Sequence, residues 1–123
     1  MSTDRGSATI WILGLAVMVL AATQLVVVRG SAVLARHRLA NTADLAALAA
    51  AATIGTNRDG CAAARRIATA NRAQLLDCVV QLDSSGRLGT CAIQLASAVT
   101  LPLAGRRTVR ARAKAARLPP AAP

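Results

Sequence analysis

The sequence contains no Glu, Phe or Tyr, and Trp11 is its single aromatic residue. Because Glu is missing, the five acidic residues are all Asp, and they are too scattered to form a carboxylate pair for acid–base catalysis. A soluble domain without aromatic rings has little large apolar surface to bury. We therefore expect such a domain to depend on a disulfide, a partner or neighbouring copies of itself.

Residues that commonly build active sites are equally scarce. His37 is the single histidine and lies between two arginines beside a long apolar segment, so no Ser-His-Asp or Cys-His nucleophile can be assembled around it. The three cysteines, Cys61, Cys78 and Cys91, include no C-x-x-C pair of the kind that binds zinc. There is no glycine-rich phosphate loop. The sequence predicts a non-enzymatic protein without a metal or a cofactor.

The charge is strongly positive, with fifteen Lys and Arg residues against five Asp and a net charge of +10. This excess permits binding to nucleic acid, anionic lipid or an acidic polymer but does not demand it, and a solvated basic face is the favoured explanation. Proteins that bind single-stranded nucleic acid usually stack bases on aromatic side chains, and the chain after residue 28 has none. Nucleic acid is therefore not the favoured partner.

A long uncharged apolar segment, 6–28, lies between Arg5 and Arg29. A helix of that length is about 35 Å long, enough to cross a bilayer. The apolar regions of signal peptides are shorter, and although a peptidase could cut near Ala21, the apolar run then resumes. We predict a leader over 1–6 and a retained, single-pass transmembrane helix over 7–28.

The positive charges on either side of the helix bear on its orientation in the membrane. Arg29, Arg36 and Arg38 follow the span whereas Arg5 precedes it, and this bias alone would place the C-terminal part in the cytoplasm.

The segment that follows, 29–54, is rich in strong helix formers and contains no Pro, so we expect the membrane helix to continue through it. Ala43, Ala47 and Ala51 recur at a spacing of four and form a narrow stripe of small side chains. The stripe suits helix packing against another subunit, and it suits packing against a head domain of the same chain. The sequence leaves both interpretations open.

A small head is predicted over 55–117. The breaker-rich "GTNRDG" ends the long helix, and Asp59 is placed to cap a second helix from Cys61 to about Gln74. Two segments of alternating pattern follow, "LDCVVQL" and "TCAIQLASAV", joined by the turn sequence "DSSG" with Gly86 at a position that favours a positive φ. Together they predict a β-hairpin.

The segment "TVRARAKAA" alternates in the same way and predicts a third strand, with Arg110, Arg112 and Lys114 on a basic face. The Pro-rich 118–123 is expected to be a disordered tail. In the first strand, Leu76, Cys78, Val80 and Leu82 are predicted to share one face. The predicted fold class is α+β, with a long N-terminal helix and a head of one helix and a three-stranded antiparallel sheet.

The cysteines suggest a structural bond. Cys61 at a helix start and Cys78 inside the first strand could tie helix to sheet outside the cytoplasm, which would stabilise the head by about 3 kcal/mol. Cys91 would then be a free buried thiol, or it could replace Cys61 as the partner of Cys78 across the hairpin.

The stretch "RGSATIWILGLAVMVLAATQLVVV", followed by "ARHRLANTADLAALAAAA", resembles the TadE-like proteins of actinobacteria. These are small pilin-like proteins associated with tight-adherence (Flp, type IVb) pilus systems. The resemblance implies an extracytoplasmic head and cleavage by a prepilin peptidase after Gly6, which leaves Ser7 as the N-terminus. The mature pilin pattern carries Glu at its fifth position, where this chain has Trp11.

The favoured function is that of a non-enzymatic, pilin-like membrane component of a tight-adherence pilus or related secretion system. Its expected partners are the membrane, other pilin-like or secretion subunits, and copies of itself. One alternative is a secreted or membrane-tethered basic protein that binds an acidic partner, either nucleic acid or an anionic polymer. Another is a secreted effector released by cleavage near Ala21.

Overall fold

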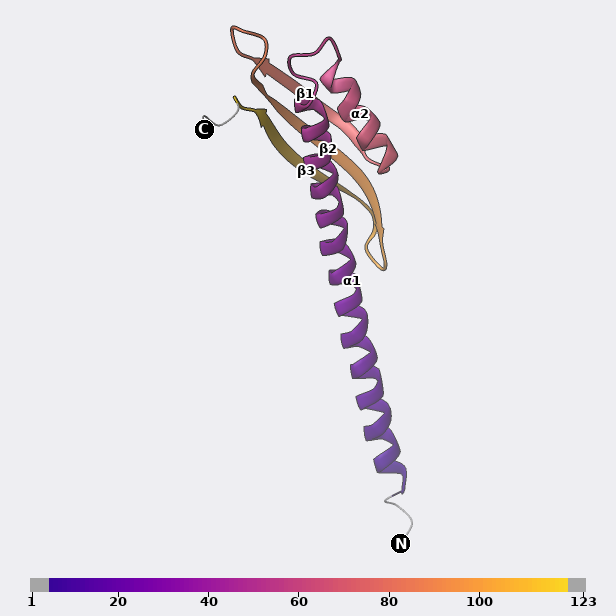
Figure 1. Ribbon diagram of the computed structural model, residues 1–123. Coiled ribbons are helices and arrows are strands. Elements are labelled where there is room, and N and C mark those ends of the chain that lie inside the picture. The colour runs from indigo at the N-terminus through magenta and orange to yellow at the C-terminus, as the bar shows by residue number, and fades with distance from the viewer. Residues whose placement is uncertain (1–4, 120–123) are drawn as a thin grey trace.

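A computed structural model of the protein describes residues 5–119, with side chains from residue 8 onward. The elements are α1 (Arg5–Ala51), α2 (Gly60–Ala70), β1 (Gln74–Leu82), β2 (Gly89–Leu101) and β3 (Gly105–Arg117). Figure 1 shows α1 as a long stem that carries a small head at its C-terminal end. The predicted α+β class, with a long apolar helix, a second helix and a three-stranded antiparallel sheet, is confirmed.

The stem is one uninterrupted helix of 47 residues, about 70 Å long at the usual rise per residue. It contains no Pro, and Gly14 and Gly30 are each tolerated inside it because a single glycine weakens a helix by only about 1 kcal/mol. The head packs against the C-terminal part of α1, whereas the side chains of residues 8–27 are exposed on every side.

The second helix begins as predicted, because the Asp59 carboxylate accepts hydrogen bonds from the backbone N–H groups of Cys61 and Ala62 at 2.9 and 3.2 Å. Gly60 allows this start to approach the end of α1 closely, since a Cβ there would lie 2.8 Å from the Thr53 hydroxyl. The predicted extension of this helix to Gln74 is wrong. Helix α2 ends at Ala70.

The early end of α2 has a local cause. Asn71 caps the helix through hydrogen bonds to the last carbonyl groups, and Arg72 adopts a positive φ of 56°. A left-handed residue at this position reverses the chain direction. The backbone N–H of Ala73 then bonds to the carbonyl of Ala68, and Gln74 already pairs with β2.

The three strands form an antiparallel sheet in the order β1-β2-β3. At the turn between β1 and β2, the N–H of Gly86 bonds to the carbonyl of Asp83 and Gly86 has a φ of 68°. The turn predicted from "DSSG" is therefore present. Strands β2 and β3 are both longer than the alternating segments in the sequence suggested, and they pair along their whole length.

A bulge between Leu75 and Asp77 changes the inner face of β1. Leu75 packs against the core, whereas Leu76 lies in the bulge and is 46% exposed. The prediction that Leu76 shares a face with Cys78 is wrong, because an extra residue shifts the side-chain alternation by one position. Beyond the bulge Cys78 faces the core as predicted.

Both helices cover the same face of the sheet, with α1 over β2 and β3 and α2 beside it over β1 (Figure 1). The core between these layers is built mainly of alanine, and its largest fully buried side chains are Leu95 and Cys91. Small side chains let α1, α2 and the sheet approach closely, but each contributes little buried apolar area. The head is therefore thin, as expected from the lack of aromatic residues.

Candidate functional site: the apolar stem and the surfaces of the head

The most unusual surface of the molecule is the exposed half of α1. Large apolar side chains there are between 53% and 79% exposed, and they point in all directions around the helix. They are Ile10, Trp11, Ile12, Leu13, Leu15, Val17, Met18, Val19, Leu20, Leu25, Val26 and Val27. Burying such a side chain is worth about 1.5 to 3 kcal/mol, so water is not a suitable environment for this segment.

The helix is long and apolar enough to cross a membrane, with a mean hydropathy of 2.4 over its most apolar window. Length and composition alone are also compatible with a signal sequence near an N-terminus. Trp11 lies within the first turns of the apolar part and Arg29 directly follows it, and the two are about 27 Å apart along the helix axis. This separation fits a hydrocarbon core of about 30 Å, with Trp and Arg at its two interfaces.

The stripe of Ala43, Ala47 and Ala51 lies inside the head. These residues are 0%, 1% and 6% exposed, in one cluster with Ala64 and Ala68 of α2. The sequence left two interpretations of the stripe open. In the structure the stripe packs against the head of the same chain. The exposed apolar half of α1 is not covered by the head, and Leu45 and Leu48 are exposed on the part of the helix that carries the head.

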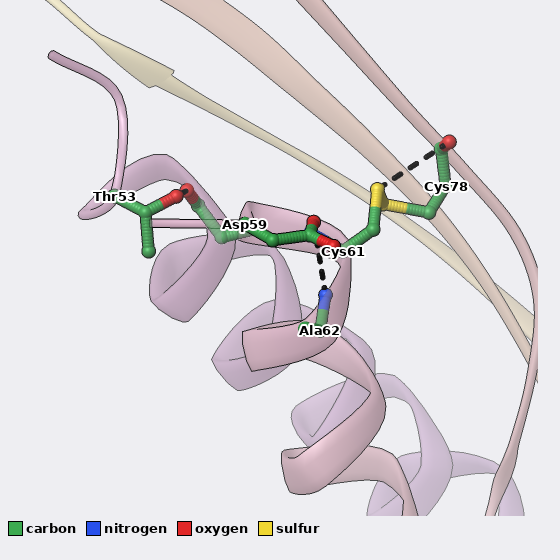
Figure 2. Close-up of a disulfide and its surroundings, with 6 residues drawn as sticks. Thr53, Asp59, Cys61, Ala62 and Cys78 are labelled. Atoms are coloured by element: carbon green, nitrogen blue, oxygen red, sulfur yellow. Dashed lines mark hydrogen bonds between the residues drawn. A yellow bond between two sulfur atoms is a disulfide. The ribbon is translucent and has the colours of Figure 1, made fainter. Parts of the chain in front are cut away.

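Cys61 and Cys78 form a disulfide with their Cα atoms 5.9 Å apart. Figure 2 shows the bond running from the first turn of α2 to β1, next to the Asp59 carboxylate that caps the same helix. The bond and the cap thus hold one point of the head, where α2 starts above the sheet. The pairing predicted from the sequence is the one present.

Cys91 is a free thiol and is 0% exposed. It lies on β2 opposite Val80, whereas Cys78 is opposite Ile93, so the alternative hairpin bridge is not formed. Burial raises the pKa of the Cys91 thiol. A buried thiol that stays protonated is a packing residue rather than a nucleophile.

The predicted basic face is present on β3. Arg110, Arg112 and Lys114 are exposed on the side of the sheet turned away from the helices, while the alternating Ala111 and Ala113 pack against the core. A shallow depression on this outer side is lined by Arg112 and Lys114 together with Asp77 and Gln94 from the other strands. The outer side of the sheet therefore offers a row of cations.

The predicted processing boundary lies at the edge of what the structure describes. Gly6 and Ser7 belong to the first turns of α1, but only their backbone is described, and residues 1–4 of the predicted leader lie outside the described residues. Residues 120–123 of the predicted disordered tail are likewise outside it. Within residues 5–119, His37 is exposed on α1, and no three His, Cys or Asp residues gather at a site that could hold a metal ion.

Sequence reasoning missed two features. The guanidinium of Arg117 donates a hydrogen bond to the carbonyl of Ile54. This contact joins distant parts of the chain, so no local sequence pattern predicts it. The turn between β2 and β3 also carries Leu103, which is 91% exposed and has a positive φ of 66°. An apolar "LPLAG" followed by two arginines is a signal that could have drawn attention to this turn.

Comparison with known proteins gives a match to a family model. The family described as Flp pilus-assembly TadE/G-like matches residues 6–53, a span that covers nearly all of α1 and ends just beyond it. This segment, which contains the N-terminal hydrophobic helix, is thus similar to the TadE/G-like Flp pilus-assembly domain. The head after residue 53 lies outside the match, and neither a curated protein nor a solved structure matches the chain.

Proposed function

We propose that the protein is a single-pass membrane protein that acts as a pilin-like component of an Flp tight-adherence pilus or a related secretion system. The observation that carries this proposal is the fully exposed apolar half of α1, inside the segment that matches the pilus-assembly family. The protein acts by assembly rather than by catalysis. Its partners are the bilayer, other pilin-like subunits and copies of itself.

The exposed stem suits a subunit held in the bilayer and also a subunit packed in a filament. In a bilayer, lipid covers the apolar side chains of residues 8–27, and their backbone groups are already paired within the helix. In a filament, the stems of neighbouring subunits would cover the same surface. The head does not compete for this surface, because it packs only on the C-terminal part of α1.

The head is assigned to the extracytoplasmic side. The arginines after the span oppose this orientation, but the charge rule is a tendency and the excess is small. The Cys61–Cys78 disulfide supports it, since disulfides persist outside the cytoplasm and are rare inside it. A head with an alanine-rich core also gains most from such a bond.

A topology experiment tests the proposal directly. The full chain carrying a C-terminal alkaline phosphatase should be enzymatically active and should stay with the membrane after carbonate extraction. Peptide mapping without reductant should recover Cys61 linked to Cys78 from the same membranes. An inactive fusion together with three free thiols would place the head in the cytoplasm and overturn the pilin-like assignment.

Mass spectrometry of the membrane-derived protein tests the proposed processing. A chain that starts at Ser7 is expected from cleavage after Gly6. An intact N-terminus would make the protein a plain membrane anchor. A chain that starts at Ala22 would instead support the secreted effector.

The second candidate function is binding of an acidic partner by the outer side of the sheet, which the exposed row of Arg110, Arg112 and Lys114 favours. Replacing all three with Gln separates the two functions. If the protein acts by pilus assembly, the variant should still assemble in the membrane. Under that function its retention on heparin should also stay close to that of the parent chain. If the protein acts by binding an acidic polymer through this row, the variant should lose its retention on heparin.

A further inference from the structure

The turn between β2 and β3 has an apolar apex with no cover. Leu103 is 91% exposed, more than any other large apolar side chain for which exposure is described, and it is held at a φ of 66° that leucine rarely adopts. Pro102 next to it is also exposed. Folding in water alone gives no reason to present a leucine at the tip of a hairpin.

This turn lies on the stem side of the head. Figure 1 shows the β2–β3 hairpin running back along α1 toward its N-terminal half. Val99 and Thr100, near the end of β2, line a depression together with Ala35 and Leu39 of α1. Each further residue of an extended strand advances about 3.3 Å, so Leu103 reaches still closer to the exposed apolar half of α1.

The partial burial of α1 supports the same placement. Val28, Ser31, Ala32 and Ala35 are partly covered, and at helical spacing they continue the face that Leu39 buries in the head. The cover on this face of α1 thus extends down to the level of Arg29, where the apolar span ends. The hairpin tip is the part of the head nearest to this level (Figure 1).

Exposed arginines follow the apolar apex in β3 and are present on the part of α1 that the hairpin runs along. Arg106 and Arg107 follow the turn directly and are exposed, and Arg29, Arg36 and Arg38 are exposed on the adjoining part of α1. The acidic residues for which the structure gives positions lie elsewhere: Asp44 is further along α1, Asp77 is on the outer side of the sheet, and Asp59 and Asp83 are in other loops. This end of the head is therefore basic around one apolar tip.

The opposite hairpin provides an internal contrast. The turn between β1 and β2 is made of Asp83, Ser84, Ser85, Gly86, Arg87 and Leu88, and it lies near Gly55, beyond the end of α1. It is polar at its apex, and its side chains bond to its own backbone. Only the hairpin that points along the stem has an apolar apex.

We propose that the β2–β3 turn docks on the bilayer that holds α1, with Leu103 at the boundary between headgroups and acyl chains and with Arg106 and Arg107 on anionic lipid phosphates. An apolar tip flanked by cations is the pattern that binds anionic membrane interfaces. The proposal rests on α1 being membrane-inserted, as proposed above, but it holds on either side of the membrane. The second attachment fixes the tilt of the head relative to α1 before assembly.

The test uses the full chain reconstituted into vesicles of phosphatidylcholine with phosphatidylglycerol. An environment-sensitive fluorophore is attached to Leu103→Cys, to the matched control Ser84→Cys at the opposite hairpin, and to Val19→Cys within the apolar span. The chain without an introduced cysteine is treated with the same fluorophore, so that any reaction of the buried Cys91 is measured. Leu103 and Ser84 are exposed, so neither substitution disturbs the core.

We expect emission from position 103 to be shifted to the blue and quenched several-fold more strongly by lipid-borne spin labels near the headgroups than emission from position 84. An aqueous quencher should show the reverse order. If position 19 is quenched by lipid while positions 103 and 84 behave alike, the turn does not dock on the bilayer, and the membrane insertion of α1 is still supported. If position 19 is water-exposed as well, the proposed function fails together with the docking.

A variant without two positive charges tests whether Arg106 and Arg107 bind anionic lipid. Arg106→Gln with Arg107→Gln should reduce lipid quenching at position 103 at least twofold on vesicles that contain phosphatidylglycerol, and should have little effect on pure phosphatidylcholine. Arg110→Gln with Arg112→Gln, which removes two charges from the same strand farther from the turn, should leave the quenching unchanged. Equal quenching of the Arg106–Arg107 variant and its parent on the anionic vesicles would overturn the role given to the lipid phosphates.

Discussion

Arg117, the last residue of β3, donates a hydrogen bond from its guanidinium to the carbonyl oxygen of Ile54, just after the end of α1. The bond spans 63 residues of sequence and joins the C-terminal edge of the sheet to the end of the stem. It also brings a positive charge to the C-terminal end of a long helix, where the helix dipole favours a cation.

Replacing Arg117 with Gln should therefore destabilise the head by about 1 kcal/mol, since a hydrogen bond to a partly exposed carbonyl is lost. Thermal unfolding of the full chain in detergent, followed by far-ultraviolet circular dichroism, measures the change. Arg110→Gln on the outer side of the same strand is the matched control and should leave the unfolding temperature unchanged. Equal effects of the two variants would show that the contact with Ile54 contributes nothing.

Loss of the Cys61–Cys78 disulfide should destabilise the head by about 3 kcal/mol, because the bond closes a loop with a sequence separation of 17 residues. For a domain of this size the unfolding temperature should fall by roughly 10 to 20 °C. The Cys61→Ser, Cys78→Ser double variant measures the effect without a mispaired thiol. Adding reductant should lower the unfolding temperature of the parent chain and not that of the variant.

The Cys91 thiol should resist alkylation in the folded protein. It is fully buried and burial raises its pKa, so both access and the thiolate fraction are reduced. Iodoacetamide at mildly alkaline pH should label Cys91 at least tenfold faster after denaturation than before it, with mass spectrometry as the readout. Rapid labelling of the native chain would contradict the packing of β2 against the helices.

Ala47→Leu should destabilise the head by about 1 to 3 kcal/mol, because Ala47 is 1% exposed and a larger side chain must displace its neighbours. Ala40→Leu introduces the same side chain at an exposed position of α1 and serves as the control. The unfolding temperature should fall only for the first variant. Loss of assembly with unchanged head stability would instead indicate that Ala47 packs against another subunit.

The loop between β1 and β2 should show a pH dependence through Asp83. Hydrogen bonds from the Ser85 hydroxyl, and then from the backbone N–H of Leu88, hold the pKa of Asp83 below its ordinary value. A lowered pKa in the folded state means that the carboxylate stabilises the loop above its unfolded pKa of about 4, and that this contribution disappears as the pH falls through the folded value.

The stability difference between the parent chain and Asp83→Asn should therefore be largest near neutral pH and should shrink below about pH 4. Unfolding temperatures measured at several pH values give this difference. Asp77→Asn, on the outer side of β1, controls for the general effect of removing one negative charge. A difference that stays constant from neutral to acidic pH would show that the loop does not depend on the ionised carboxylate.

Much of this architecture could be predicted because it rests on local chemistry. The stem follows from the uncharged apolar run 6–28 and the helix formers after it, and the hairpin follows from the alternation of apolar residues around "DSSG". The cap at Asp59 was also predicted, since it depends on where a helix begins. In all of these, a short stretch of chain contains the information.

The tertiary structure decided the features that depend on which surfaces meet. The sequence allowed the stripe of Ala43, Ala47 and Ala51 to face either another subunit or the head, because small side chains accept almost any close neighbour, and packing on α2 and the sheet selected the head. The bulge that exposes Leu76 arises from pairing with β2 rather than from the pattern of β1 itself. The position of the β2–β3 turn along the stem depends on the path of the whole hairpin across α1, so no local pattern could reveal it.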